Sequence, residues 1–274
     1  MTAPDAVELT ADAAWLLAES LGAGSFPWVL AITGPHDRSQ NASVCEEMTE
    51  LGVLLPNGAV HAAVARWIRT ACAPQAWLEL RYVRDRGAAV LRGLVARRAD
   101  HTVVVLRSGP LVTVSELPIS DAAFLVPAVT APLRHRTPAR FTEFILPTRV
   151  GARADERLRA GADVDAVLDE LGVPPSAAAV VRSVFTGGSD YLEIRAGCAR
   201  DGRHQLSEVG IGIVDTPAGR LLVSPQQAED GTWLSSFAPA TPFAIAAALD
   251  RLTDTLPAGR WFPSAVLTRD FAAP

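Results

Sequence analysis

The amino-acid sequence predicts an α+β fold of one domain, residues 1–274, with two quasi-symmetric αβ halves at about 1–135 and 136–274. Runs rich in Val and Leu alternate with short turn signals, as is typical of β-strands joined in succession. Connections this short allow only hairpins, so each half should hold an antiparallel meander. The expected strands are 76–84, 90–98, 102–107 and 111–117, then 190–199, 206–215, 220–225 and 232–238.

The two halves also resemble each other residue by residue. The tetrapeptide ELGV stands at 50–53 and again at 170–173, and WLELR at 77–81 returns as YLEIR at 191–195. In both halves a helix precedes that strand, and three strands and another helix follow it. We interpret this as a duplication with a pseudo-two-fold axis. The alternative is that two similar αβ layers share aliphatic strands by composition alone.

Helices are expected where apolar residues recur at helical spacing between capping and stop signals. The first helix should begin at a Thr10 or Asp12 cap and end at Gly22, and residues 26–33 read as a short strand followed by a polar loop at 37–43. Pro127 should kink or split the helix that contains it. The expected helices are 10–21, 59–71, 120–133, 152–160, 163–171, 175–185 and 242–256.

Composition restricts the class of protein. A chain of 274 residues that is 49% hydrophobic can bury a large core. Its formal charge is -5, and 25 basic and 30 acidic residues are interspersed, which argues against nucleic acid or an anionic membrane as the main partner. The three cysteines, Cys45, Cys72 and Cys198, lie far apart and suit a reducing cytoplasm. No signal peptide and no apolar run of the ~18 residues that span a bilayer is visible.

The sequence offers no recognisable catalytic constellation. All 25 basic residues are Arg, so chemistry that needs a lysine amine is excluded. No nucleophile elbow, phosphate-binding loop or dinucleotide fingerprint is present, and no His lies at metal-pair spacing with another His or Cys. We therefore expect a non-enzymatic protein without cofactor or metal. Two alternatives stay open: a diverged hydrolase that uses His101 or His204 beside a carboxylate, and a homo-oligomeric structural protein.

One run of the predicted sheet suggests a binding surface. Along residues 206–215, strand alternation places Val209, Ile211 and Ile213 on one face and Glu208, Gly210 and Gly212 on the other. The second face lacks bulk, and glycine within a strand often marks the close approach of a partner. Its alternative explanation is a bulge, or one of the chain's own helices packed on the glycines.

A second run, at 232–238, adds aromatic residues to this surface. Trp233 shares a face with Ser235 and Phe237. A half-exposed aromatic face beside a smooth strand can receive apolar side chains from another protein.

Long ungapped words over nearly the whole chain resemble the EspG family, the chaperones of mycobacterial type VII (ESX) secretion, and most of all its branch serving the third ESX system. The words are AVELT (6–10), LGAGSFPWVL (21–30), RADE (153–156), LGVPPS (171–176), VDTP (214–217), WFP (261–263) and LTRDF (267–271).

The resemblance implies two αβ halves joined through a central antiparallel sheet with helices around it, and a cytoplasmic protein that binds PE–PPE heterodimers at the PPE tip and keeps them soluble. It implies contacts through the central sheet, C-terminal elements and a hairpin loop after the first strand, which matches the short turn 84–87 here. Free protein could form a weak homodimer. The expected partner-binding residues are Arg84, Asp85, Arg86, Arg195, Glu208, Gly210, Gly212, Gln227, Trp233 and Ser235.

Overall fold

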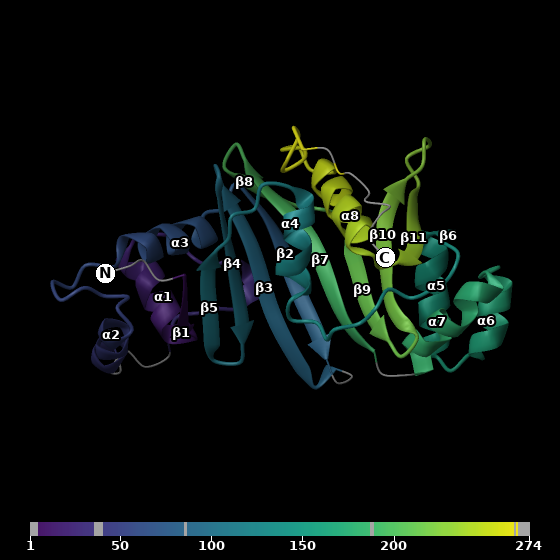
Figure 1. Ribbon diagram of the computed structural model, residues 1–274, viewed down its shortest axis with the longest axis horizontal. Helices are drawn as coiled ribbons and strands as arrows, with labels where there is room; N and C mark the ends of the chain where they lie inside the picture. The colour runs from purple at the N-terminus through teal and green to yellow at the C-terminus, as the bar shows by residue number, and fades with distance from the viewer. Residues whose placement is uncertain (1–4, 36–40, 85–86, 187–188, 266, 268–274) are drawn as a thin grey trace. The chain divides into compact units, whose positions relative to one another are not determined.

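The structure is a computed structural model that describes residues 5–35, 41–84, 87–186, 189–265 and 267 (Figure 1). Its helices are α1 (Ala11–Ser20), a 3₁₀ turn η1 (Trp28–Leu30), α2 (Asn41–Glu50), α3 (Ala62–Cys72), α4 (Ala122–Thr130), α5 (Thr148–Arg159), α6 (Val164–Glu170), α7 (Pro175–Thr186) and α8 (Pro242–Asp254). Its strands are β1 (Ala6–Thr10), β2 (Ala76–Arg84), β3 (Ala89–Arg98), β4 (His101–Ser108), β5 (Leu111–Glu116), β6 (Phe144–Pro147), β7 (Asp190–Arg200), β8 (Arg203–Leu206), β9 (Ile211–Thr216), β10 (Gly219–Gln227) and β11 (Trp233–Pro239).

The predicted α+β class is confirmed by a large antiparallel sheet with helices. Among the described residues the strands hydrogen-bond in the order β1-β5-β4-β3-β2-β7-β9-β10-β11-β6, with β8 beside β7. In each half the strand that precedes the meander, β1 or β6, returns to pair with the last meander strand, β5 or β11. The equal order supports a duplication, which stays a prediction.

Close contacts divide the chain into two compact units. Unit 1 comprises Met1–Arg81, Leu91–Ile119 and Ala196–Leu206. Unit 2 comprises Tyr82–Val90, Ser120–Arg195 and Ser207–Pro274. Both β2 and β7 contribute residues to each unit. No helix among the described residues is long and apolar enough to cross a membrane.

Unit 1 is built around α1 and α3, which pack on β4 and β5 (Figure 1). Its core buries apolar side chains of the helices, such as Leu17 and Trp67, against strand residues such as Val105 and Val114. The α1 helix begins where Thr10 Oγ1 accepts a hydrogen bond from the Ala13 amide at 3.1 Å, the predicted capping interaction.

At one end of this sheet, Glu116 holds three neighbours together. Its Oε2 accepts hydrogen bonds from Arg66 at 2.7 Å and from the Trp67 indole at 2.8 Å, and its Oε1 lies 2.5 Å from His101 Nδ1. Burial by itself raises the pKa of Glu116, but the hydrogen bonds of Arg66, Trp67 and His101, with the charge of Arg66, lower that pKa to about 2. The carboxylate therefore ties α3 to β4 and β5.

The low pKa of Glu116 predicts a loss of stability in acid. Because the folded pKa, about 2, lies below the ordinary value of 4.5, the stabilisation is complete above about pH 5 and disappears as the pH falls toward 2. Urea unfolding of the wild type and of Glu116→Gln between pH 7 and pH 2.5 measures this. The difference in unfolding free energy between the two should shrink across that window, and a constant difference would contradict the prediction.

Unit 2 places helices on both faces of its strands. The α8 helix packs on β9, β10 and the neighbouring α4, whereas α7 contacts β9 and α5 lies against β11 and β6 (Figure 1). On the α7 side, Val180 and Leu221 share a buried cluster with Phe237, whose ring stacks on Phe144 with centroids 4.7 Å apart. Phe237 is therefore part of the packing.

A charged pair is also buried in unit 2. Arg220 on β10 donates from Nε to Asp215 Oδ1 at 2.6 Å and from a terminal nitrogen to Oδ2 at 3.1 Å. Only 3% of the Asp215 side chain and 11% of the Arg220 side chain are exposed. Asp190 lies opposite Asp215 in the β7–β9 register and pairs with Arg134 at 3.0 Å. Each of two neighbouring carboxylates thus has its own arginine.

Two local predictions near the N-terminus are wrong. Residues 26–33 form no strand: Trp28–Leu30 is a 3₁₀ turn ended by Ala31 with φ 49°, and the side chains of Arg92 and Arg107 take the carbonyls that a strand would have used. The polar stretch that was expected to be a loop at 37–43 enters α2 at Asn41, and residues 36–40 lie outside the described residues. The strands β1 and β6 were not predicted.

Candidate partner-binding site

The partner-binding residues expected from the sequence that the structure describes all lie in unit 2. Arg84 is the last residue of β2, and its buried Nε has no hydrogen-bond partner among the described residues. Asp85 and Arg86 lie outside those residues. The remaining seven, which we call the predicted face, are Arg195, Glu208, Gly210, Gly212, Gln227, Trp233 and Ser235.

The single strand predicted at 206–215 is wrong, because the chain leaves the sheet at 207–210 between β8 and β9. Arg195 holds this segment by donating to the Ser207 carbonyl at 2.7 Å, and Ser207 Oγ donates to the Val209 carbonyl at 2.7 Å. A Cβ at Gly210 would lie 2.7 Å from the Ile194 carbonyl oxygen. Gly210 therefore allows the segment to approach the backbone of β7.

The predicted face is open where it runs over β7 and β9. Gly212 lies between Glu193 and Val223 in the strand registers, and within 4 Å a Cβ built on it would meet only Val223 among the described residues, at 3.7 Å. Glu208 and Gly210 are exposed and Gly212 is half-buried. The described helices of this chain do not cover these three residues.

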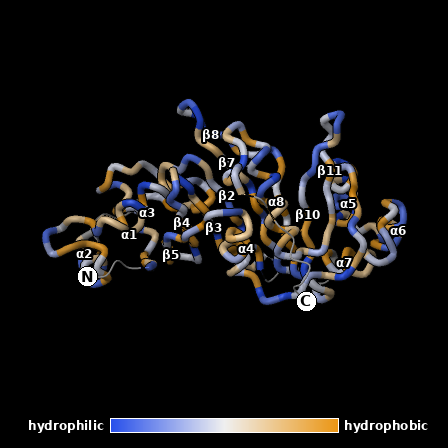
Figure 2. Tube along the Cα trace, turned by 45° about the horizontal axis from the view of Figure 1, so that its top comes forward, coloured by the Kyte–Doolittle hydropathy of each residue, from blue (hydrophilic) through white to orange (hydrophobic). Residues whose placement is uncertain are grey.

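The same face is more occupied toward β11. Trp233 and Gln227 are opposite each other in the β10–β11 register, and both side chains are at least partly exposed. Gln227 donates to the Gly231 carbonyl at 3.2 Å within the hairpin, whose tip is hydrophilic (Figure 2). The Ser235 hydroxyl lies 3.0 Å from that of Thr148 at the start of α5. The structure thus brings Gln227, Trp233 and Ser235 together but uses Ser235 internally.

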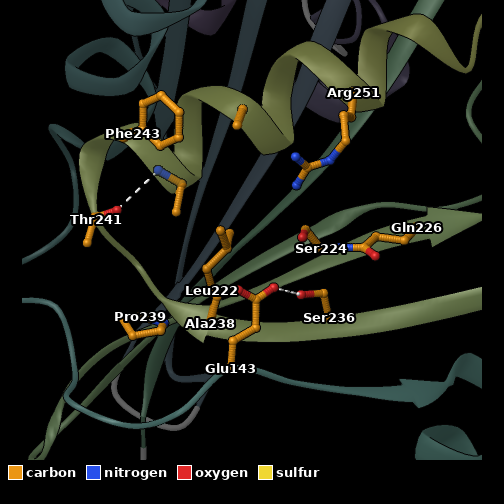
Figure 3. Close-up of a pocket in the computed structure, with 12 residues that line it drawn as sticks. Glu143, Leu222, Ser224, Gln226, Ser236, Ala238, Pro239, Thr241, Phe243 and Arg251 are labelled. Carbon is orange, nitrogen blue, oxygen red and sulfur yellow. Dashed lines mark hydrogen bonds between the residues drawn. The ribbon is translucent and has the colours of Figure 1, made fainter. Parts of the chain in front are cut away.

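A groove that the sequence reasoning missed lies on the opposite face of β10 and β11. Strand alternation puts Ser224 and Gln226 on the side away from Gln227, and α8 forms the wall above them (Figure 3). The cavity, which we call the α8 groove, measures about 290 Å³. It is lined by Glu143, Leu222, Ser224, Gln226, Ser236, Ala238, Pro239, Thr241, Phe243, Ala244, Ala247 and Arg251.

The α8 groove combines an apolar floor with a polar rim. Leu222 and Ala238 lie beneath α8, and Ser236 donates a 2.6 Å hydrogen bond to Glu143 Oε1 (Figure 3). One sequence signal could have indicated it: Ser224 and Ser236 are polar residues at strand positions that face a helix and are 3% and 2% exposed. Buried hydroxyls at inward positions mark a gap in apolar packing.

The hydrolase alternative gains no support from the two histidines. His101 does lie beside a carboxylate, but both oxygens of Glu116 are already engaged, and its low pKa makes it a poor proton acceptor near neutral pH. Neither histidine lines the α8 groove. His204 is exposed and meets the Trp77 ring edge-on at 5.4 Å. Glu116 with His101 is best explained as a structural clamp.

Comparison with known proteins identifies the family. The family model described as the EspG family matches residues 10–251. This chain belongs to the EspG family. It is 52% identical over 287 residues to the ESX-3 secretion-associated protein EspG3 of Mycobacterium tuberculosis (strain CDC 1551 / Oshkosh), covering 98% of this chain and 97% of that protein. It is 53% identical over 273 residues to EspG3 of Mycolicibacterium smegmatis, covering 98% and 93%.

A member of another branch is less similar to this chain. The ESX-1 secretion-associated protein EspG1 of Mycobacterium marinum is 29% identical over 96% of this chain and 92% of its own length. The identities therefore place the chain in the branch of the third ESX system. A solved structure of Mycobacterium tuberculosis EspG5, in complex with the PE25–PPE41 dimer, has a TM-score of 0.80 at 23% identity, covering 94% of this chain and 99% of EspG5. That likeness confirms the EspG-like fold.

Proposed function

We propose that this protein is a cytoplasmic chaperone that binds PE–PPE heterodimers of the third ESX system and keeps them soluble for secretion. The observation that carries the proposal is the 52–53% identity to EspG3 proteins over nearly the full length. The EspG-like fold adds support, because the EspG5 chain of the same fold was solved bound to a PE–PPE dimer.

The geometry of unit 2 supports binding without chemistry. An exposed loop and a glycine-bearing strand leave part of the predicted face open, and the α8 groove, on the opposite face of β10 and β11, can hold side chains of a docked protein. One helical tip can occupy only one of these two surfaces. A helical bundle with an apolar tip self-associates through that tip. A chaperone that covers the tip lowers the concentration of free, aggregation-prone substrate by mass action. Mismatched charge and shape would reject the substrates of other systems.

Complex formation tests the proposal. The protein should co-elute with a PE–PPE pair of the third ESX system in size-exclusion chromatography, and light scattering should give the mass of a one-to-one-to-one complex. Pairs of other ESX systems are the control and should elute separately. If the protein co-elutes with none of the third-system pairs, the proposal is refuted. A mass that doubles with concentration in the absence of substrate would instead support the homo-oligomeric alternative.

A further inference from the structure

The lining of the α8 groove includes an arginine, Arg251, that no described residue neutralises. Arg251 lies in the last turn of α8 and is exposed, and it has no hydrogen-bond or ion-pair partner among the described residues. The acidic residues beside it on α8, Asp250 and Asp254, are both within 3.4 Å of Arg260. The guanidinium of Arg251 reaches from α8 toward the strand that carries Ser224 and Gln226 (Figure 3).

The polar groups opposite Arg251 are also uncommitted. The side chains of Ser224 and Gln226 make no hydrogen bond with the described residues, although Ser224 is 3% exposed. Glu143, in contrast, is fixed by Ser236 at 2.6 Å. On one side of the groove, hydrogen-bond donors therefore have no acceptor among the described residues. On the other side, the Glu143 carboxylate would repel an acidic group. The charge pattern fits a single acidic group bound beside Arg251.

The remaining lining fits an apolar side chain next to that acid. Leu222 and Ala238 form the floor, and Ala244 and Ala247 leave space under α8 where larger residues would fill it. A cavity of about 290 Å³ is at the lower end of the range for ligand pockets, so it accommodates one or two side chains and excludes a whole helix. Residues three or four apart at the end of a helix present such a pair on one face.

We propose that Arg251 is a specificity-determining residue: it binds a carboxylate on the helical tip of the substrate while an adjacent apolar side chain of that tip enters the α8 groove. Glu143 sets the orientation by excluding a second acid from the far end. This inference rests on the proposed function and names the chemistry that selects the substrate. Partners of this kind lose affinity when a charge at the contact is reversed, because attraction becomes repulsion.

Charge reversal provides the test. Titration calorimetry with a purified third-system PE–PPE pair that binds the wild type should show affinity at least about tenfold weaker for Arg251→Glu, and a smaller loss for Arg251→Met. Arg69→Glu is the matched control. Like Arg251, Arg69 is exposed in the last turn of its helix without a partner among the described residues, but it lies in unit 1, and its reversal should change Kd less than about twofold.

A compensating change makes the experiment specific. Replacing the contacting acid of the PPE tip with Arg should restore binding to Arg251→Glu but weaken binding to the wild type. If the wild type binds and Arg251→Glu binds equally well, the inference is overturned while the chaperone function stands. If the wild type binds no third-system pair, the proposed function itself fails. Thermal unfolding of both Arg251 variants should match the wild type, because the side chain is exposed.

Discussion

Replacing Arg220 with Met should destabilise the protein by about 3–5 kcal/mol, since removing one member of a buried ion pair leaves its partner charged and unpaired. Asp215 is 3% exposed in its side chain and faces Asp190 across the β7–β9 register. Without Arg220, no described arginine pairs with Asp215, because Arg134 pairs with Asp190. The lost side chain also releases the Arg134 carbonyl, which it binds at 2.6 Å.

An exposed arginine supplies the control for this prediction. Arg260 pairs with Asp250 and Asp254 at 3.4 Å, with 48% of its side chain exposed. Arg260→Met should lower the unfolding free energy by less than about 1 kcal/mol, because water screens surface pairs. Urea unfolding at pH 7 measures both variants. If Arg220→Met and Arg260→Met lower the unfolding free energy by the same small amount, the Asp215–Arg220 pair contributes no more to stability than a surface contact.

The substitution Gly219→Ala should cost about 3 kcal/mol or more, because it combines backbone strain with a collision. Gly219 has φ +116°, a conformation that residues with a Cβ rarely adopt. A Cβ there would lie 2.7 Å from Ala139 Cα and 2.8 Å from its nitrogen. The segment cannot move aside easily, since the Ala139 amide donates to the Arg220 carbonyl at 2.9 Å and Ala139 itself is buried.

Substitution at Gly231 measures the cost of backbone strain in the absence of a steric clash. Gly231 has φ +83° in the β10–β11 hairpin, and a Cβ there would meet no atom of the described residues within 4 Å. Gly231→Ala should therefore show only the strain, about 1–2 kcal/mol. Unfolding free energies of the two variants give the difference. If Gly231→Ala lowers the unfolding free energy as much as Gly219→Ala does, the contact with Ala139 does not contribute to the destabilisation by Gly219→Ala.

Local sequence patterns predicted most of the secondary structure because the relevant forces are local. The boundaries of β2 agree with the predicted run at 76–84, and α7 and α8 begin at the expected prolines, Pro175 and Pro242. Strand alternation and hairpin turns act over a few residues, so their signals are present in the sequence itself. The error at 206–215 has the opposite origin: Arg195 and the Ile194 carbonyl decide where that chain bends.

Local sequence patterns also predicted part of the candidate site. Alternation put Trp233 on one face with Ser235 and Phe237, but it could not show that Thr148 would engage Ser235. Gln227 was expected there from the family resemblance alone. The α8 groove was missed because its polar lining comes from Glu143, two β-strands and α8, segments that the sequence separates by as many as 108 positions, from Glu143 to Arg251. Tertiary packing brings these distant residues together, so no short sequence motif marks the groove.

The sequence by itself determined the α+β class, the antiparallel meanders and the membership of the EspG family, since periodicity, turn residues and long shared words depend on neighbouring residues alone. The tertiary structure decided which positions stay uncovered and which charges stay unpaired. Arg251 and Arg220 are both arginines near the same strands, yet Asp215 neutralises one and no described residue neutralises the other. That difference arises from distances between segments remote in the chain.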